Sequence, residues 1–209
     1  MTLALVAVAA TSAFAQLSVG AGYLSNTQKY SYTSGSTTTT TPTTTNGFYV
    51  GADYGLDLGQ GLGLSAGLKG AFLFGKKVDS ITIPILGTAT GTTKSTEIYL
   101  AVPVLANYSY AITNDFKIFA YAGPTVAFGL TSKAKTTNNL NDDVTTTDNY
   151  GEDSDYGRVN VFLGAGIGVD LMNTIRVKAG YDIGLLNRSS ADNTKINDAQ
   201  LSVGVAYLF

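Results

Sequence analysis

Residues 158–209 alternate between apolar and polar or small side chains almost without interruption. In the first part of this stretch, Val161 and Leu163 fall on one face while Gly164 and Gly166 fall on the other. A repeat of two is the spacing of side chains on one face of an extended strand. The pattern predicts three half-buried antiparallel strands, at 158–171, 175–185 and 199–209. It leaves open whether the apolar face meets a protein core or lipid.

The small number of charged residues indicates that the apolar face meets lipid. Charged residues make up 13% of the sequence, about half of the ~25% usual in soluble domains. A water-soluble barrel needs a charged exterior, and this chain has too few charges to coat one. We therefore expect the apolar face of each strand to meet outer-membrane lipid.

The missing residue types exclude several functions. The sequence has no cysteine and no histidine, which removes disulfides, thiolate metal sites, Ser-His-Asp catalysis and His-containing metal clusters. The net charge of −2 offers no basic surface for nucleic acid. We expect no enzyme activity, no cofactor and no nucleic-acid partner.

The same alternation occurs five more times before residue 158. The additional predicted strands are 17–23, 48–58, 62–74, 98–110 and 116–130. The connections are short after the second, fourth and sixth strands, whereas long polar loops are predicted at 25–46, 75–94, 131–157 and 186–197. An even number of strands with short turns on one side is the pattern of a transmembrane barrel. We predict an all-β, eight-stranded antiparallel up-and-down transmembrane barrel with both termini on the short-turn, periplasmic side.

Aromatic residues and glycines support this assignment. Aromatic side chains on the apolar face cluster near both ends of the strands, as in the girdles of membrane barrels; they are Tyr108, Tyr110, Phe116, Tyr207 and Phe209 at one end and Tyr23, Phe48, Phe72, Phe74 and Phe128 at the other. Most strand glycines fall on the opposite face, which points into the lumen. The lumen of an eight-stranded barrel is narrow, so small residues relieve crowding there. Pro103 and Pro124 lie inside strands, and we expect a bulge or kink near each.

Both ends of the sequence carry predicted targeting signals. Residues 1–15 form an apolar run that ends in Ala13-Phe14-Ala15, a small-x-small cleavage pattern. We predict that 1–15 is a signal peptide for export through the inner membrane and that 16–209 is the barrel domain, located in the cell outer membrane. The last strand presents the signal that the outer-membrane assembly machinery reads, at Val205, Tyr207 and Phe209.

Four stretches resemble a known family. IYLAVPVLANYSY (98–110), FKIFAYAGPTVAFGL (116–130), VFLGAGIGVDL (161–171) and the closing LSVGVAYLF are similar, in the same order, to the outer-membrane barrel domain of the PorT-like "porin family" proteins of Bacteroidota. Val102 stands where that family usually has an isoleucine, and the first loop is unusually rich in threonine. The resemblance implies an eight-stranded outer-membrane barrel and, for a few members, a part in protein secretion.

Charged residues on the inner face form a predicted network in the lumen. Its members are Asp53, Lys69, Glu97, Lys117, Arg158, Asp170, Arg176, Lys178 and Asp182. Counted from the short turns, Lys117, Asp170 and Arg176 share a low height, Asp53 and Lys69 a middle one, and Glu97 and Arg158 a high one. Because an unpaired charge in a narrow lumen is costly, we expect opposite charges at matching heights to pair. The functional alternative is a selective ion path or a gate.

The third long loop is acidic. Its carboxylates are Asp142, Asp143, Asp148, Glu152, Asp153 and Asp155. Ca²⁺ takes oxygen ligands, but the spacing fits no EF-hand. We therefore favour a solvated loop over a metal site.

These features predict a small non-enzymatic outer-membrane barrel, with a plugged lumen and long loops that contact an unknown extracellular or envelope partner. We expect a monomer. The alternatives are a component of a protein secretion or envelope machine, as in PorT-like proteins, and a narrow passive pore.

Overall fold

The computed structural model describes residues 15–83, 87–138, 144–152 and 154–209. The predicted signal peptide therefore lies outside the described residues except for Ala15. The strands are β1 (Ala15–Ser34), β2 (Thr37–Gly59), β3 (Leu62–Ile83), β4 (Gly87–Thr113), β5 (Phe116–Asn138), β6 (Val144–Asp148), β7 (Val159–Leu171), β8 (Ile175–Gly184) and β9 (Thr194–Leu208). No helix in the described part of the chain has the length and apolar character needed to cross a membrane.

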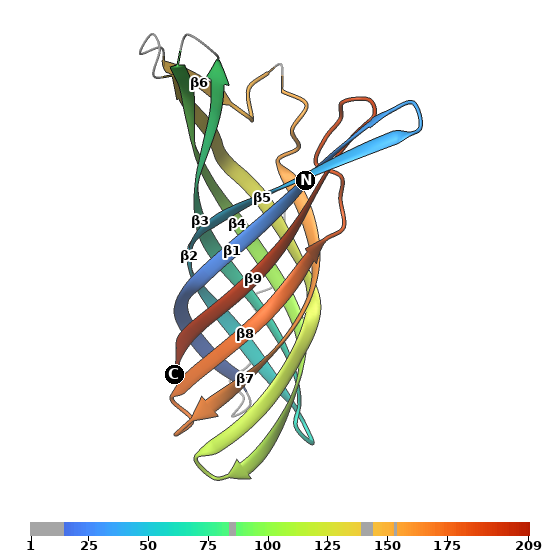
Figure 1. Ribbon diagram of the computed structural model, residues 1–209. Helices are drawn as coiled ribbons and strands as arrows, with labels where there is room; N and C mark the ends of the chain where they lie inside the picture. The colour runs from blue at the N-terminus through green and yellow to red at the C-terminus, as the bar shows by residue number, and fades with distance from the viewer. Residues whose placement is uncertain (1–14, 84–86, 139–143, 153) are drawn as a thin grey trace.

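Eight of these strands close into a ring (Figure 1). Sequence neighbours pair antiparallel around it, β5 pairs with β7, and β1 pairs with both β2 and β9. The short strand β6 stands outside the ring and pairs only with the end of β5. Closure leaves no unpaired edge in the ring, and an unpaired edge would be costly if the ring stood in lipid, as predicted. The predicted fold class, an eight-stranded antiparallel barrel, is confirmed.

The outer surface of the ring is apolar. Large apolar side chains that alternate along the strands are exposed, among them Leu163 and Val203. The residues next to them, Gly164 and Gly204, are buried. The direction of the predicted apolar face, outward, is confirmed.

Aromatic rings explain why glycine is needed on the inner face. A Cβ atom at Gly168 would collide with the ring of Phe119, and one at Gly204 with the ring of Tyr49. The ring of Phe119 lies against its own strand partner on β7, and the ring of Tyr49 on β2 reaches past β1 to β9. A narrow barrel can hold inward-pointing rings only where facing positions have no side chain.

The two prolines interrupt the strand ladders without a bulge. The pairing of β3 with β4 is interrupted opposite Pro103, and the pairing of β4 with β5 opposite Pro124, but the register is the same on both sides of each gap. The register shifts in this region lie at Ile98/Tyr99 and Ala111/Thr113 instead. The predicted bulge near each proline is therefore wrong, whereas the alternative of a kink stays a prediction: the missing N–H removes a bond, and the neighbouring pairs hold the alignment.

The strands extend far beyond their predicted ends. The predicted first loop, 25–46, is mostly a hairpin, because β1 continues to Ser34 and β2 begins at Thr37. Threonine has a high strand propensity, and facing hydroxyls bond across this hairpin, as between Thr33 and Thr38 (Oγ1–Oγ1 3.0 Å). Each predicted strand stopped where its apolar face stopped. A solvated hairpin needs no apolar face.

The other long connections are also largely strand. β3 and β4 pair up to Ile83↔Gly87, and β5 continues to Asn138. In Figure 1 the arm formed by β1 and β2 leaves the ring on one side, and the extensions of β3, β4 and β5 rise on the other. The opposite end of the barrel has tight turns, with positive φ at Gln60, Met172 and Asn173. We call these two ends the long-loop end and the short-turn end.

Candidate functional site

The charges at the short-turn end lie together. Arg176 on β8 donates from Nε and Nη2 to both carboxylate oxygens of Asp170 on β7, at 2.7 Å each. Its guanidinium also lies 4.5 Å from the ring centre of Phe119. Lys117 is the strand partner of Asp170 on the other side. The three charges predicted at one height are therefore neighbours. The ion pair forms between Asp170 and Arg176, whose strands are joined by a tight turn.

The charges at middle height pair differently from the prediction. Asp53 on β2 accepts a hydrogen bond from Lys178 on β8, across the lumen, at 2.9 Å. Matching heights on adjacent strands had favoured Lys69. The ammonium of Lys69 lies 5.5 Å from the ring centre of Tyr49 instead. Asp182 is the strand partner of Gly164. The prediction went wrong because a narrow lumen lets side chains reach across as easily as along the wall.

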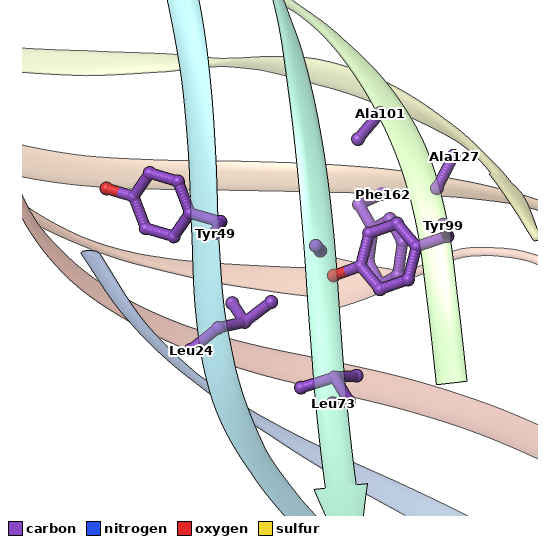
Figure 2. Close-up of a cluster of buried hydrophobic side chains, with 8 residues drawn as sticks. Leu24, Tyr49, Leu73, Tyr99, Ala101, Ala127 and Phe162 are labelled. Atoms are coloured by element: carbon purple, nitrogen blue, oxygen red, sulfur yellow. The ribbon is translucent and has the colours of Figure 1, made fainter. Parts of the chain in front are cut away.

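An apolar layer fills the lumen nearer the long-loop end. Figure 2 shows these side chains pointing inward from several strands; the layer consists of Leu24, Tyr49, Ala71, Leu73, Tyr99, Ala101, Ala127 and Phe162. Leu73 is completely buried. Glycine and polar residues were expected on the inner face of the strands, and this layer was not predicted. The ring of Tyr49 can stand here because it lies against Gly22 and Gly204, which have no side chain.

A buried arginine dominates the long-loop end. Arg188, in the loop between β8 and β9, is only 6% exposed. It donates to Asp198 (Nη1–Oδ2 3.0 Å), to Glu97 (Nη2–Oε1 2.9 Å) and to the hydroxyl of Tyr150 (2.7 Å). Its guanidinium lies 4.1 Å from the ring centre of Tyr156. We call Arg188, Glu97, Asp198, Tyr150 and Tyr156 the mouth cluster.

The predicted high pair of Glu97 and Arg158 does not form. Glu97 is bound by Arg188, and its Oε1 also accepts from the hydroxyl of Tyr150 at 3.0 Å. Arg158 is exposed. It lies over the ring of Tyr150, 4.7 Å from its centre, and donates to the carbonyl oxygen of that residue. The partner of Glu97 is Arg188, a loop residue that strand positions alone could not reveal.

Asp198 is the most enclosed charge of the mouth cluster. Its side chain is 0% exposed. Besides Arg188, it accepts hydrogen bonds from Asn160 (2.9 Å), Gln28 (3.2 Å) and Asn26 (3.4 Å). A buried carboxylate is stable only when it is paired and hydrogen-bonded. Strands β1, β7 and β9 are thereby tied to the loop that carries Arg188.

Backbone contacts between two loops hold Arg188 in place. Its N–H donates to Ile196 (2.9 Å) and its carbonyl accepts from Gly157 (2.7 Å). The N–H of Ser190 donates to Asp155 at 2.9 Å. The segment before β7 and the loop after β8 therefore run side by side over the mouth of the barrel.

Burial and charge fix the protonation states in the mouth cluster. Burial raises the pKa of Tyr156 well above its ordinary value, and the Glu97 carboxylate raises it further. The pKa of Tyr150 is raised for the same two reasons. Burial alone would lower the pKa of Arg188, but Glu97 and its other neighbours raise it. Both tyrosines stay neutral and the guanidinium stays charged.

Two cavities lie at opposite ends of the lumen. A cavity of about 430 Å³, which we call the vestibule, opens above the mouth cluster at the long-loop end. A second of about 120 Å³ lies at the short-turn end beside Asp170 and Arg176. Between them, the cavity beside Tyr49 and Tyr99 has only about 40 Å³.

The acidic loop shows no metal geometry in its described part. Asp142, Asp143 and Asp153 lie outside the described residues. Asp148 accepts from the backbone N–H of Tyr150 (3.0 Å), and Asp155 accepts from the hydroxyl of Ser190 (3.3 Å). Within the ranges that the structure describes, no group of three or more Asp or Glu residues could hold a metal ion.

Two of the predicted assembly-signal residues, Val205 and Tyr207, lie on β9, which closes the ring, and Phe209 follows its last residue. Val205, Tyr207 and Phe209 are all exposed on the apolar outer surface. The rings of Tyr207 and Phe209 meet edge to face, with centres 4.7 Å apart.

Several members of the site were missed, although the sequence held a signal for some of them. Asn26 and Gln28 continue the inward positions of β1, and Asp198 continues those of β9, each just beyond the predicted strand end. Extending the alternation would have found them. Arg188 and Tyr150 lie in irregular loops, where no repeat indicates direction.

Comparison with known proteins agrees with this architecture. The model of a family described as outer membrane protein beta-barrel domain matches residues 1–209. No curated protein matches the sequence. Similar solved structures include Ail, the attachment invasion locus protein of Yersinia pestis (14% identity, 93% of this chain and 98% of that chain, TM-score 0.38). Others are OprG from Pseudomonas aeruginosa (12%, 94% and 96%, 0.43) and the protease OmpT from Escherichia coli (10%, 95% and 98%, 0.43).

Proposed function

Because the chain belongs to the outer membrane protein beta-barrel domain family, we propose that it is a small outer-membrane barrel with a plugged lumen and a non-enzymatic role at the cell surface. In this proposal the long-loop end is extracellular and the short-turn end periplasmic. The hairpins and loops carry the function by contacting a partner or ligand outside the membrane. Export through the inner membrane by residues 1–15 and assembly through the last strand belong to the same proposal.

The filled lumen carries this proposal. The mouth cluster and the apolar layer lie between the vestibule of about 430 Å³ and the periplasmic cavity of about 120 Å³. Their atoms are held by ion pairs at 2.9–3.0 Å and by the packing of Leu73, Tyr99 and Phe162. An eight-stranded barrel is just wide enough for side chains to fill. Bulk flow of ions or solutes would require both layers to move.

A non-enzymatic role is supported by the chemistry of the site. The chain has no histidine or cysteine, and the two carboxylates of the mouth cluster are both engaged by Arg188. A general base must reach the proton that it removes, and these two carboxylates, whose side chains are 12% and 0% exposed, are held by the guanidinium of Arg188. The arrangement is suited to holding the loops in one conformation.

Planar-bilayer recording tests the plugged lumen. We expect the refolded protein to insert without reproducible unit conductance. The double variant Tyr99→Ala and Phe162→Ala removes two rings of the apolar layer and should introduce measurable conductance if that layer is the barrier. As a matched control, Tyr108→Ala removes a ring from the lipid-facing side. Reproducible unit conductance of the unaltered protein would show a pore and overturn the proposal.

A further inference from the structure

We propose that the vestibule is a binding site for a neutral saccharide. The proposed function assigns no ligand to the surface loops, so this inference goes beyond it while relying on the long-loop end facing outward. Five features support it: the size of the cavity, its walls, the chemistry of its lining, an aromatic residue at its rim, and an unpaired acceptor in its floor.

The vestibule has the dimensions and walls of a small-molecule site. Its volume of about 430 Å³ lies within the roughly 300–1,000 Å³ of known ligand pockets. Its walls come from β1, β2, β4, β5, β9 and the two loops that run over the mouth. The mouth cluster lies beneath and ties these elements together through Arg188 and Asp198. A floor fixed in this way presents its polar groups in a constant arrangement.

The lining consists mainly of hydroxyls and side-chain amides. Ser95, Thr96, Ser132, Asn149 and Ser189 are among its residues. Hydroxyls and amides both donate and accept hydrogen bonds, as the hydroxyls of a sugar also do. The lining includes few apolar side chains, which distinguishes the vestibule from the mostly apolar pockets that bind drug-like molecules.

Charge argues against an anionic ligand. No lysine or arginine lies among the described lining residues, whereas Glu97 and Asp155 do. Glu97 is already neutralised by Arg188. A sulfated or phosphorylated ligand would meet carboxylates and find no cation in the wall. The lone Asp155 carboxylate can accept from two adjacent hydroxyls of an uncharged sugar.

A tyrosine at the rim supplies a flat apolar surface. Tyr30 on β1 lines the vestibule and is 45% exposed. One face of a pyranose ring presents C–H groups, which pack favourably on the electron-rich face of an aromatic ring. Tyr32, two residues further along the same face of the strand, is 48% exposed but does not line the vestibule. The pair therefore offers an internal control.

The floor holds an unpaired acceptor. Asn26 lines the vestibule and is 3% exposed, and its Oδ1 is buried without a hydrogen-bond partner in the structure. Such an oxygen costs free energy until a donor reaches it. Because Asn26 is one of the lining residues, a sugar hydroxyl can bond to this oxygen after a small movement of the floor side chains.

Saturation-transfer NMR on the intact protein in detergent tests the inference. The probes are cellobiose, lactose and maltose, with spermidine and a sulfated disaccharide as charged comparisons. We expect saturable binding of at least one neutral disaccharide and none of the sulfated one. The neutral polysaccharide released from lipopolysaccharide, added separately, tells whether the saccharide comes from solution or from the outer leaflet of the membrane; its binding also supports the inference.

Matched variants locate the site. Tyr30→Ala should weaken binding about two- to tenfold through the lost ring contact, and Tyr32→Ala should leave it unchanged. Ser95→Ala removes a lining hydroxyl from the inward side of β4, and Thr93→Val, on the same side of that strand but outside the lining, is its control. All four positions lie at the long-loop end, and strand content by circular dichroism checks that each variant folds.

Three outcomes overturn the inference: no saturable binding of any neutral saccharide, tighter binding of spermidine than of every saccharide, or equal effects of the lining variants and their controls. Bilayer conductance is measured independently of saccharide binding. A conducting protein that binds saccharide would refute only the plugged lumen, and a silent one that binds none would refute only the saccharide site.

Discussion

The two ends of the lumen each hold an arginine bound to carboxylate, but they are built in different ways. At the short-turn end, Arg176 and Asp170 are strand partners six positions apart, joined by two bonds of 2.7 Å. At the long-loop end, Arg188 comes from an irregular loop and meets Glu97 and Asp198 from separate strands. The first pair follows from the register of neighbouring strands. The second exists only after the loops have folded over the barrel, so it links those loops to the wall.

The largest expected effect comes from removing the loop-borne arginine. Arg188→Ala leaves Glu97 and Asp198 buried without their countercharge, which should lower the free energy of unfolding by about 3–5 kcal/mol. Urea titration of the protein in vesicles measures this. Arg158→Ala removes an exposed arginine from the same end and should cost far less. Similar losses for the two variants would mean that burial does not distinguish them.

The next effect concerns the packing beside Arg176. Gly168→Ala places a methyl group against the ring of Phe119, on which Arg176 rests, and against the carbonyl of Val177. Overpacking of this kind should cost about 1–3 kcal/mol. Gly70→Ala is the matched control, since a Cβ there meets only side-chain atoms at 3.8 Å and 4.0 Å. The same unfolding titration measures both variants. Equal losses of stability would show that contact with the ring is not the reason for glycine at position 168.

Breaking the short-turn pair should have a smaller effect than breaking the long-loop one. Asp170→Asn removes the charge from a bidentate pair whose arginine is 25% exposed. Because water can partly replace the lost bonds, we expect a loss of about 1–2 kcal/mol. Asp115→Asn, in the exposed turn nearby, should change stability by less than about 0.5 kcal/mol. A loss at Asp170 as large as that of Arg188→Ala would remove the difference between the two ends.

The smallest effect is expected in the threonine-rich hairpin. Thr38→Ala deletes one cross-strand hydroxyl bond, to Thr33, and should cost about 0.2–1 kcal/mol. Amide hydrogen exchange of the hairpin should increase, while exchange in the ring below stays the same. Faster exchange throughout the ring would show that this hairpin supports the barrel as well as extending it.

The sequence predicted the membrane-facing part of the fold and little beyond it. In the ring, one face of each strand meets apolar surroundings, so the alternation of apolar and polar side chains reveals each strand. Short turns such as Met172-Asn173 then fix how neighbouring strands are aligned. Above the ring both faces of β1 and β2 meet water, and the repeat disappears although the strands continue to Ser34 and Thr37.

The candidate site divides in the same way. Arg176 and Asp170 could be placed together because a tight turn relates their positions. Glu97 was placed on the inner face but assigned Arg158, because Arg188 lies in a loop whose course depends on tertiary contacts. The apolar layer was missed for a different reason: Leu73 and Phe162 occupy inward positions that the composition argument reserved for small and polar residues.

The seam between β1 and β9 has a kinetic consequence. It joins Ser18 to Leu208 and continues to Tyr32 and Thr194, so the contact that completes the wall connects opposite ends of the described chain. Pairings with such long sequence separation form late, because the loss of chain entropy comes before the contacts that compensate for it. Until the last strand docks, two hydrogen-bonding edges remain open, and the time spent in that state sets the interval during which the chain is vulnerable to aggregation.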